Sequence, residues 1–327
     1  MRVLKESDVK TFEQLCGLTQ MGLKKTLSKF LRSKYDKIIE TKDYLLAEGD
    51  IPIALVAHMD TVFPKPPTDI FYDRVKNVML SPTGLGADDR AGVFAIIQII
   101  RRGLRPHIIF TTDEESGCLG ASKLANIKCP FADLRYLIQL DRRNACDCVF
   151  YDCDNKEFVQ YVETFGFVEN YGSFSDISMI CPAWKIAGVN LSIGYYNEHS
   201  TGELLYIGQM LTTIERVIKM LQEKEIPSFE YIESAYSYNK WYRHYTSWSS
   251  PSGKHACTKC QKEFLTEELI PVKGLDEYLK YYCIDCISDD NVDWCKMCGD
   301  AYEIDPNKKN TSGVCEDCLY DYFYPYH

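Results

Sequence analysis

The chain has 327 residues, of which 46% are hydrophobic and 26% charged, and its formal net charge is −10. This composition is typical of a globular protein, and the length favours two domains over one. The negative charge argues against a general nucleic-acid binder, and no apolar run approaches the roughly 18 residues of a membrane span. The N-terminus lacks a signal-peptide core, so we expect a cytoplasmic protein.

Apolar periodicity predicts alternating helices and strands through the first two thirds of the chain. Residues 6–34 have the pattern of two amphipathic helices, and residues 52–56 (PIALV) form an apolar run typical of a strand covered on both faces. Further strands are predicted at 37–40, 44–47, 108–111, 136–140 and 187–193, and further helices at 89–102, within 116–126, and at 156–165 and 203–224. This order predicts an α/β three-layer sandwich with a mainly parallel central sheet.

Polar side chains follow several of these strands or begin a helix. They are His58, Asp88, the Glu114–Glu115 pair, Asp141 and His199. Ligands of open parallel sheets bind beyond the carboxyl ends of the strands, and mixed imidazole and carboxylate donors suit divalent zinc, cobalt or manganese. Each residue alone also has a structural explanation, such as helix capping by Asp88 or a surface ion pair of Asp141.

Five segments resemble, in order, the motifs of the co-catalytic di-zinc exopeptidases of peptidase families M20, M28 and M42. They are HMDTV, GLGADDRAGV, TTDEESGCLGA, QLDRR and NLSIGYYNEHSTGE. The resemblance implies an amide-cleaving hydrolase, with an aminopeptidase or related exopeptidase as the leading hypothesis. The alternatives are a non-peptidase amidohydrolase or deacylase and a partner-recruiting protein with a vestigial hydrolase core. Arg142 and Arg143 either grip a substrate carboxylate or form structural ion pairs.

The resemblance implies a role for each candidate side chain. The implied ligands are His58 and Asp141 for one catalytic Zn²⁺, Glu115 and His199 for the other, and Asp88 as the bridge between the two. Co²⁺ and Mn²⁺ are alternative ions. Asp60 is expected to orient the His58 imidazole, and Glu114 is expected to be the general base. The resemblance also implies a cis peptide between Asp88 and Asp89.

The sequence departs from the M20 pattern in one respect. M20 peptidases carry a lid domain between the last carboxylate ligand and the final histidine, but only 58 positions separate Asp141 from His199. That span must also provide a helix and strands of the core, so no lid of ordinary domain size fits. The plan is closer to the single-domain M28 and M42 enzymes. Within the span, Ser175-Asp176 resembles an S/T-D motif of these families.

Eight of the 15 cysteines form four C-x-x-C pairs near the C-terminus. The pairs are Cys257/Cys260, Cys283/Cys286, Cys295/Cys298 and Cys315/Cys318. Eight thiolates are enough for two structural Cys₄ zinc sites, in modules that resemble zinc ribbons or treble clefs, and sequential pairing is favoured over crossed pairing. Residues 250–327 hold 8 Lys or Arg against 15 Asp or Glu, which opposes binding to phosphates.

The predicted domains are a catalytic domain (1–225), an aromatic and Ser-rich linker (226–254) and a tandem Cys₄ module (255–327). The linker aromatics are expected to pack on one of the domains. The other seven cysteines are interpreted as buried thiols in a reducing compartment. Expected partners are a peptide or N-acyl substrate and, through the zinc module, a protein, whereas no nucleic acid or membrane is expected. The module could also act as a lid or only stabilise the enzyme.

Overall fold

The computed structural model describes residues 3–234, 254–265, 269–275, 279–287, 292–294 and 301–304. The chain divides into two compact units, Met1–Ser237 and Tyr238–His327. None of the helices within the described ranges is long and apolar enough to cross a membrane.

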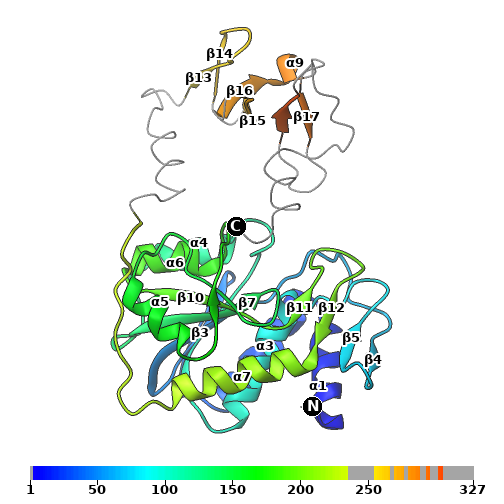
Figure 1. Ribbon diagram of the computed structural model, residues 1–327, viewed down its shortest axis with the longest axis vertical. Coiled ribbons are helices and arrows are strands. Elements are labelled where there is room, and N and C mark those ends of the chain that lie inside the picture. The colour runs from blue at the N-terminus through cyan, green and yellow to red at the C-terminus, as the bar shows by residue number, and fades with distance from the viewer. Residues whose placement is uncertain are drawn as a thin grey trace. The chain divides into compact units, whose positions relative to one another are not determined.

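The N-terminal unit alternates helices and strands (Figure 1). Its helices are α1 (Glu6–Cys16), α2 (Gln20–Arg32), α3 (Ala87–Arg101), α4 (Leu119–Ala125), α5 (Lys156–Glu163), α6 (Asp176–Trp184) and α7 (Ile207–Leu221). Its strands are β1 (Lys37–Glu40), β2 (Tyr44–Glu48), β3 (Ile51–His58), β4 (Phe71–Asp73), β5 (Val78–Leu80), β6 (Pro106–Thr111), β7 (Tyr136–Arg142), β8 (Asp147–Val149), β9 (Val168–Glu169), β10 (Gly188–Ser192), β11 (Tyr195–Tyr196) and β12 (Leu204–Tyr206). The α/β order expected from the sequence is confirmed.

An eight-stranded sheet in the order β1-β2-β6-β3-β7-β10-β8-β9 forms the middle of this unit. Its four central strands, β6, β3, β7 and β10, run parallel, and antiparallel pairs join β2 and β8 to them. The apolar run in β3 explains its central place, because a strand with helices over both faces must bury every side chain. The mainly parallel sheet is therefore confirmed.

Alternate residues of β2, β6, β3 and β7 enter two separate apolar cores. Leu45 and Leu55 pack with α1, α2, α3 and α7, whereas their neighbours Leu46 and Val56 pack with α4 and α6. Because successive strand residues point to opposite faces, this division places one helical layer on each side of the sheet (Figure 1). This arrangement confirms the three-layer sandwich predicted from the sequence.

One predicted helix starts later than expected, and one observed helix was not predicted. The helix expected at 203–224 begins at Ile207, because residues 204–206 form β12 and pair with β5 in a second sheet of order β11-β12-β5-β4. Helix α6 was not predicted, since it is short and contains Pro182. It lies between Asp141 and His199, where every element belongs to this unit, so no lid domain is inserted there.

Residues 226–234, at the start of the predicted linker, pack on the core. The Phe229 ring lies 4.7 Å from that of Phe158 and 5.2 Å from that of Tyr161, between ring centroids. The Ala187 amide donates a hydrogen bond to the carbonyl of Phe229. This segment therefore adds apolar surface to the N-terminal unit, and residues 235–253 lie outside the described residues.

The described part of the C-terminal unit contains a hairpin and a small sheet. The hairpin joins β13 (Lys254–Ala256) to β14 (Glu263–Leu265). The sheet has the order β16-β15-β18-β17. Its strands are β15 (Leu269–Lys273), β16 (Leu279–Cys283), β17 (Val292–Trp294) and β18 (Ala301–Glu303), and the short helix α9 (Ile284–Ile287) follows β16.

Candidate metal centre

The carboxyl ends of the central strands bring the candidate side chains together. His58 is the last residue of β3 and pairs with Thr111, the last residue of β6. Glu114 and Glu115 follow β6, and Asp141 lies near the end of β7. Because parallel strands end at one edge of a sheet, residues far apart in sequence meet there.

Two groups of three possible ligands share Asp88. The first contains His58, Asp88 and Asp141, and the second contains Asp88, Glu115 and His199. His58 Nε2 lies 3.0 Å from Asp88 Oδ1 and 3.5 Å from Asp141 Oδ1. His199 Nε2 lies 3.2 Å from Asp88 Oδ2 and 3.1 Å from Glu115 Oε2. The two oxygens of one carboxylate thus face two different histidines.

These distances fit a pair of divalent ions. Tetrahedral ligands about 2.0–2.1 Å from a zinc ion lie roughly 3.3 Å from one another. Glu115 Oε1 is buried and has no hydrogen-bond partner among the described residues, so it is a further potential metal ligand at the site. Burial and the neighbouring Asp88 raise the pKa of the Asp141 carboxyl, which reflects charge repulsion that a cation would relieve.

Asp60 links the imidazole to the acidic loop. Its Oδ1 lies 3.2 Å from His58 Nδ1 and accepts a hydrogen bond from the Glu114 amide, while Oδ2 accepts one from the Glu115 amide. One carboxylate therefore contacts the His58 imidazole and also hydrogen bonds to the backbone that carries both glutamates. The sequence indicated the contact with His58 but not the contacts with the loop.

The turn that carries Asp88 depends on close backbone packing. The Asp88–Asp89 peptide is cis, in line with the resemblance. The amides of Gly86 and Asp88 both donate to the buried carboxylate of Glu203. At Gly92 an added Cβ would lie 2.3 Å from the Leu140 carbonyl oxygen, so only glycine lets α3 approach β7 this closely. Sequence reasoning missed Glu203, because it fell within the predicted helix.

Glu114 is buried near several other carboxylates. Its side chain is buried, and that burial together with nearby carboxylates raises its pKa to about 9, although His58 opposes the shift. Cys118 Sγ and Ser175 Oγ lie 3.6 and 3.3 Å from Glu114 Oε1. A carboxyl with a raised pKa is suited to accepting and holding a proton.

The Ser175-Asp176 pair lies at the site, although the sequence analysis assigned it no definite role. The Ser175 hydroxyl is 2.9 Å from Asp141 Oδ2, and Gln139 Nε2 donates to both of these oxygens. Thr111 donates to Asp176, whose other oxygen is buried and has no hydrogen-bond partner in the described part of the chain. Ser175 is the N-cap of α6 and Asp176 its first residue, and this helix was not predicted.

Other acidic and basic residues near the motifs serve different contacts. Asp113 forms two hydrogen bonds with the side-chain amide of Gln20. Its carboxylate accepts one from Gln20 Nε2 and its backbone N–H donates one to Gln20 Oε1, which ties the acidic loop to the start of α2. Arg143 forms an ion pair with Glu198, and Arg142 donates to the carbonyl of Tyr171. Both arginines therefore already have partners within the N-terminal unit.

A cavity of about 490 Å³ opens beside Glu115. The α1–α2 turn, the proline-rich loop 61–67 and the loop 113–116 form its walls, and its lining includes Thr19, Phe63 and Ser116. This volume falls in the range of small-molecule sites. The cavity gives a substrate room beside the candidate metal ligands.

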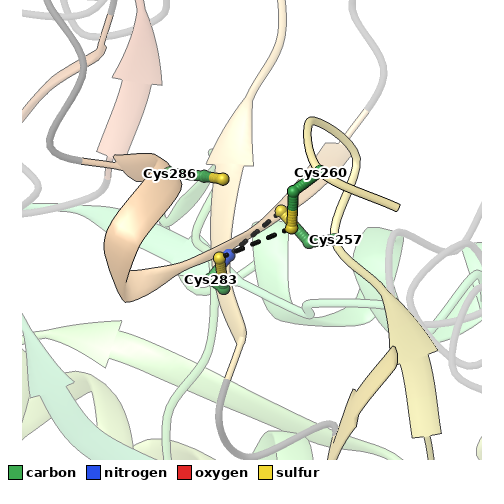
Figure 2. Close-up of side chains that lie close together, drawn as sticks. All are labelled: Cys257, Cys260, Cys283 and Cys286. Atoms are coloured by element: carbon green, nitrogen blue, oxygen red, sulfur yellow. Dashed lines mark hydrogen bonds between the residues drawn. The ribbon is translucent and has the colours of Figure 1, made fainter. Parts of the chain in front are cut away.

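The C-terminal unit holds a second candidate metal site, shown in Figure 2. The sulfur atoms of Cys257, Cys260, Cys283 and Cys286 lie within 4.8 Å of one another. Cys260 Sγ is 3.9 Å from Cys283 Sγ, close to the roughly 3.8 Å that Zn–S bonds of 2.3 Å produce in a tetrahedron. Although burial opposes it, backbone amides lower the pKa of Cys257 to about 6, which favours the thiolate.

The cluster combines the first and second C-x-x-C pairs. This is the sequential arrangement that the sequence favoured. The first pair lies in the turn of the β13–β14 hairpin, and the second lies at the end of β16 and within α9. Cys295, Cys298, Cys315 and Cys318, expected to form the other site, lie outside the described residues.

Comparisons with known proteins agree with this geometry. Residues 41–160 match the model of peptidase family M28. No curated protein sequence matches the chain. Among solved structures, a tripeptidase from Staphylococcus aureus is similar with a TM-score of 0.59 and 14% identity, over 67% of this chain and 98% of its own.

Two aminopeptidase structures are also similar. The aminopeptidase PepT from Bacillus cereus has a TM-score of 0.54 and 17% identity, over 66% of this chain and 97% of its own. A TET aminopeptidase from a marine sediment archaeon, a member of the Thaumarchaeota, has a TM-score of 0.53 and 14% identity, over 68% and 98%. At these identities the likeness establishes the fold. Residues 41–160 thus match peptidase family M28, within a unit that has the α/β fold of these peptidase structures.

Proposed function

We propose that the protein is an aminopeptidase that uses two divalent ions, zinc in the first place, to cleave the first peptide bond of short peptides. The observation that carries this proposal is the pair of ligand groups that share Asp88, with Glu114 beside them. The proposed ligands are His58 and Asp141 for one ion, Glu115 and His199 for the other, and Asp88 for both.

Each side chain has a separate task in the proposed reaction. When bound, the two ions supply Lewis acidity for the scissile carbonyl and lower the pKa of a water molecule. Glu114 accepts the proton of the attacking water and returns it to the leaving amine. Asp60 keeps the His58 imidazole in its orientation through Nδ1, and the cavity beside Glu115 receives part of the substrate.

A panel of short substrates tests this function. The full-length protein loaded with Zn²⁺ is expected to hydrolyse peptides with a free N-terminus, and an N-acetyl group is expected to abolish cleavage. Dialysis against a chelator should remove the activity, and added Zn²⁺ should restore it, with products followed by mass spectrometry. Turnover of N-acyl amino acids in preference to every free peptide would instead identify a deacylase of the same fold.

We also propose that Cys257, Cys260, Cys283 and Cys286 bind a structural Zn²⁺, which all four positions would surround without leaving room for a reacting water. Such a site fits a reducing, cytoplasmic location, because disulfides would consume the same thiols. The acidic composition of residues 250–327 favours a protein partner over a nucleic acid.

Replacing Cys283 with alanine is expected to lower the zinc content by about one ion per chain, because three thiolates hold zinc less tightly than four. Elemental analysis after dialysis measures this, and peptide hydrolysis should continue. Cys129→Ala is the control, since this half-buried thiol hydrogen bonds to the Phe131 carbonyl, away from both candidate sites. An unchanged zinc content in Cys283→Ala would contradict the site.

A further inference from the structure

One oxygen of the Glu114 carboxylate has two side-chain neighbours that could donate to it. Cys118 Sγ lies 3.6 Å and Ser175 Oγ 3.3 Å from the same atom, Oε1. Hydrogen bonds from sulfur are longer than those from oxygen, so both distances are compatible with donation. The other oxygen, Oε2, has no hydrogen-bond partner within the described residues. It is not one of their buried unpartnered atoms, so it is accessible to solvent. The two oxygens of this carboxylate are therefore not equivalent.

The two neighbours differ in how far their protons are available to Oε1. Burial raises the pKa of the Cys118 thiol, which keeps it protonated and able to donate. Gln139 Nε2 donates to Ser175 Oγ at 2.8 Å, so the single hydroxyl proton of Ser175 must point elsewhere. Asp141 Oδ2 and Glu114 Oε1 are both within its reach, and Asp141 is the nearer. Cys118 is consequently the donor devoted to Glu114 alone.

Two helices of the same layer present these donors. Cys118 immediately precedes α4, and its amide donates to the Glu114 carbonyl at 2.8 Å. Ser175 immediately precedes α6, which packs against α4. Side chains at the starts of packed helices have little freedom, so both donors are held in place relative to the acidic loop.

We propose that Cys118 and Ser175 are positioning residues that hold Oε1 of Glu114, so that Oε2 is the oxygen directed at the reacting water. The proposal rests on the proposed function, since it takes Glu114 as the general base. It predicts that loss of the Cys118 thiol slows the chemical step without weakening substrate binding, because Cys118 does not line the substrate cavity.

Steady-state kinetics of Cys118→Ala and Cys118→Ser test this role. The alanine variant is expected to lose about 5- to 10-fold in kcat, the effect of one hydrogen bond to a charged group, with KM unchanged. The serine variant keeps a donor and should recover most of that loss. In a Glu114→Gln background the alanine substitution should cost almost nothing more, because the group it positions can no longer accept a proton.

Two further variants serve as comparisons. Cys148 of β8 is fully buried and hydrogen bonds to none of the candidate site residues within the described chain, so Cys148→Ala controls for loss of a buried thiol. Ser175→Ala should also lower kcat, and its zinc content is measured in parallel because Ser175 also contacts Asp141. A kcat loss in Cys148→Ala equal to that in Cys118→Ala would overturn the proposal.

A spectroscopic readout tests the contact without any turnover. The infrared S–H stretching band of Cys118 is isolated as the difference between the wild-type protein and Cys118→Ala. With Zn²⁺ bound, which favours the ionised form of Glu114, the band is expected to lie at higher frequency in Glu114→Gln, because a neutral amide accepts more weakly than a carboxylate. An unchanged band would show that the thiol does not donate to Glu114, and the proposal would then be wrong.

The outcomes separate this inference from the proposed function. If the wild-type protein cleaves no peptide but the S–H band shifts in Glu114→Gln, the proposed function is refuted while the contact between Cys118 and Glu114 is supported. A protein that cleaves peptides, depends on Glu114 and tolerates Cys118→Ala without loss of kcat retains the function and refutes the positioning role. Equal losses from Cys118→Ala in the wild-type and Glu114→Gln backgrounds would also refute it, because they would indicate a packing defect.

Discussion

Replacing Glu114 with glutamine is expected to lower kcat by about 10²–10⁴-fold while both ions remain bound, since general acid–base catalysis typically contributes this much. Glutamine has nearly the same shape and can still accept hydrogen bonds from Cys118 and Ser175 through its carbonyl oxygen. It cannot take a proton from water. Steady-state hydrolysis of a free peptide and elemental analysis of the same sample measure the two effects.

Glu157→Gln is the matched control, because Glu157 lies exposed on the first turn of α5 and outside the candidate centre. It should behave as the wild type. Near-normal turnover by Glu114→Gln on every substrate that the wild-type protein cleaves would remove Glu114 as the base. Loss of metal from that variant would instead indicate that Glu114 is a ligand.

Replacing Asp88 with asparagine is expected to release both ions, because Asp88 belongs to both ligand groups. The substitution removes the negative charge while keeping the size of the side chain. Loss of a partner outside the ligand sphere typically costs roughly 10–100-fold in metal affinity, so we expect a larger loss from the shared ligand itself. Zinc titration of the dialysed protein, followed by calorimetry, measures the change.

His199→Ala provides the graded comparison for this prediction. His199 is more than half exposed and belongs to one group only, so its loss should release about one ion and leave the fold intact. Asp69→Asn, an exposed loop substitution, is the control and should bind both ions. Retention of two ions by Asp88→Asn at wild-type affinity would contradict a bridging role.

Much of the architecture was readable from local patterns. The apolar run at residues 52–56 identified a strand buried on both faces, and β3 does occupy the centre of the sheet. The order of helices and strands predicted the layered sandwich because parallel strands need covering helices between them. The short span from Asp141 to His199 excluded an inserted lid by length alone.

Prediction failed where an element has little periodicity of its own. The start of the predicted helix at residues 203–224 became β12, because pairing with β5 outweighed the local helical pattern. Helix α6 escaped notice since nine residues with an internal proline carry a weak signal. Both errors affected the site, because Glu203 and Ser175 lie at those positions.

The sequence by itself determined the types and order of the candidate ligands, since strand ends, acidic pairs and C-x-x-C spacings are local features. Only the tertiary structure decided how they are supported. Asp60 reaches the amides of Glu114 and Glu115, and Ser175 reaches Glu114 across 61 positions of chain. Such contacts have no period or spacing, because they depend on which strand ends and helix starts the completed sheet brings to one edge.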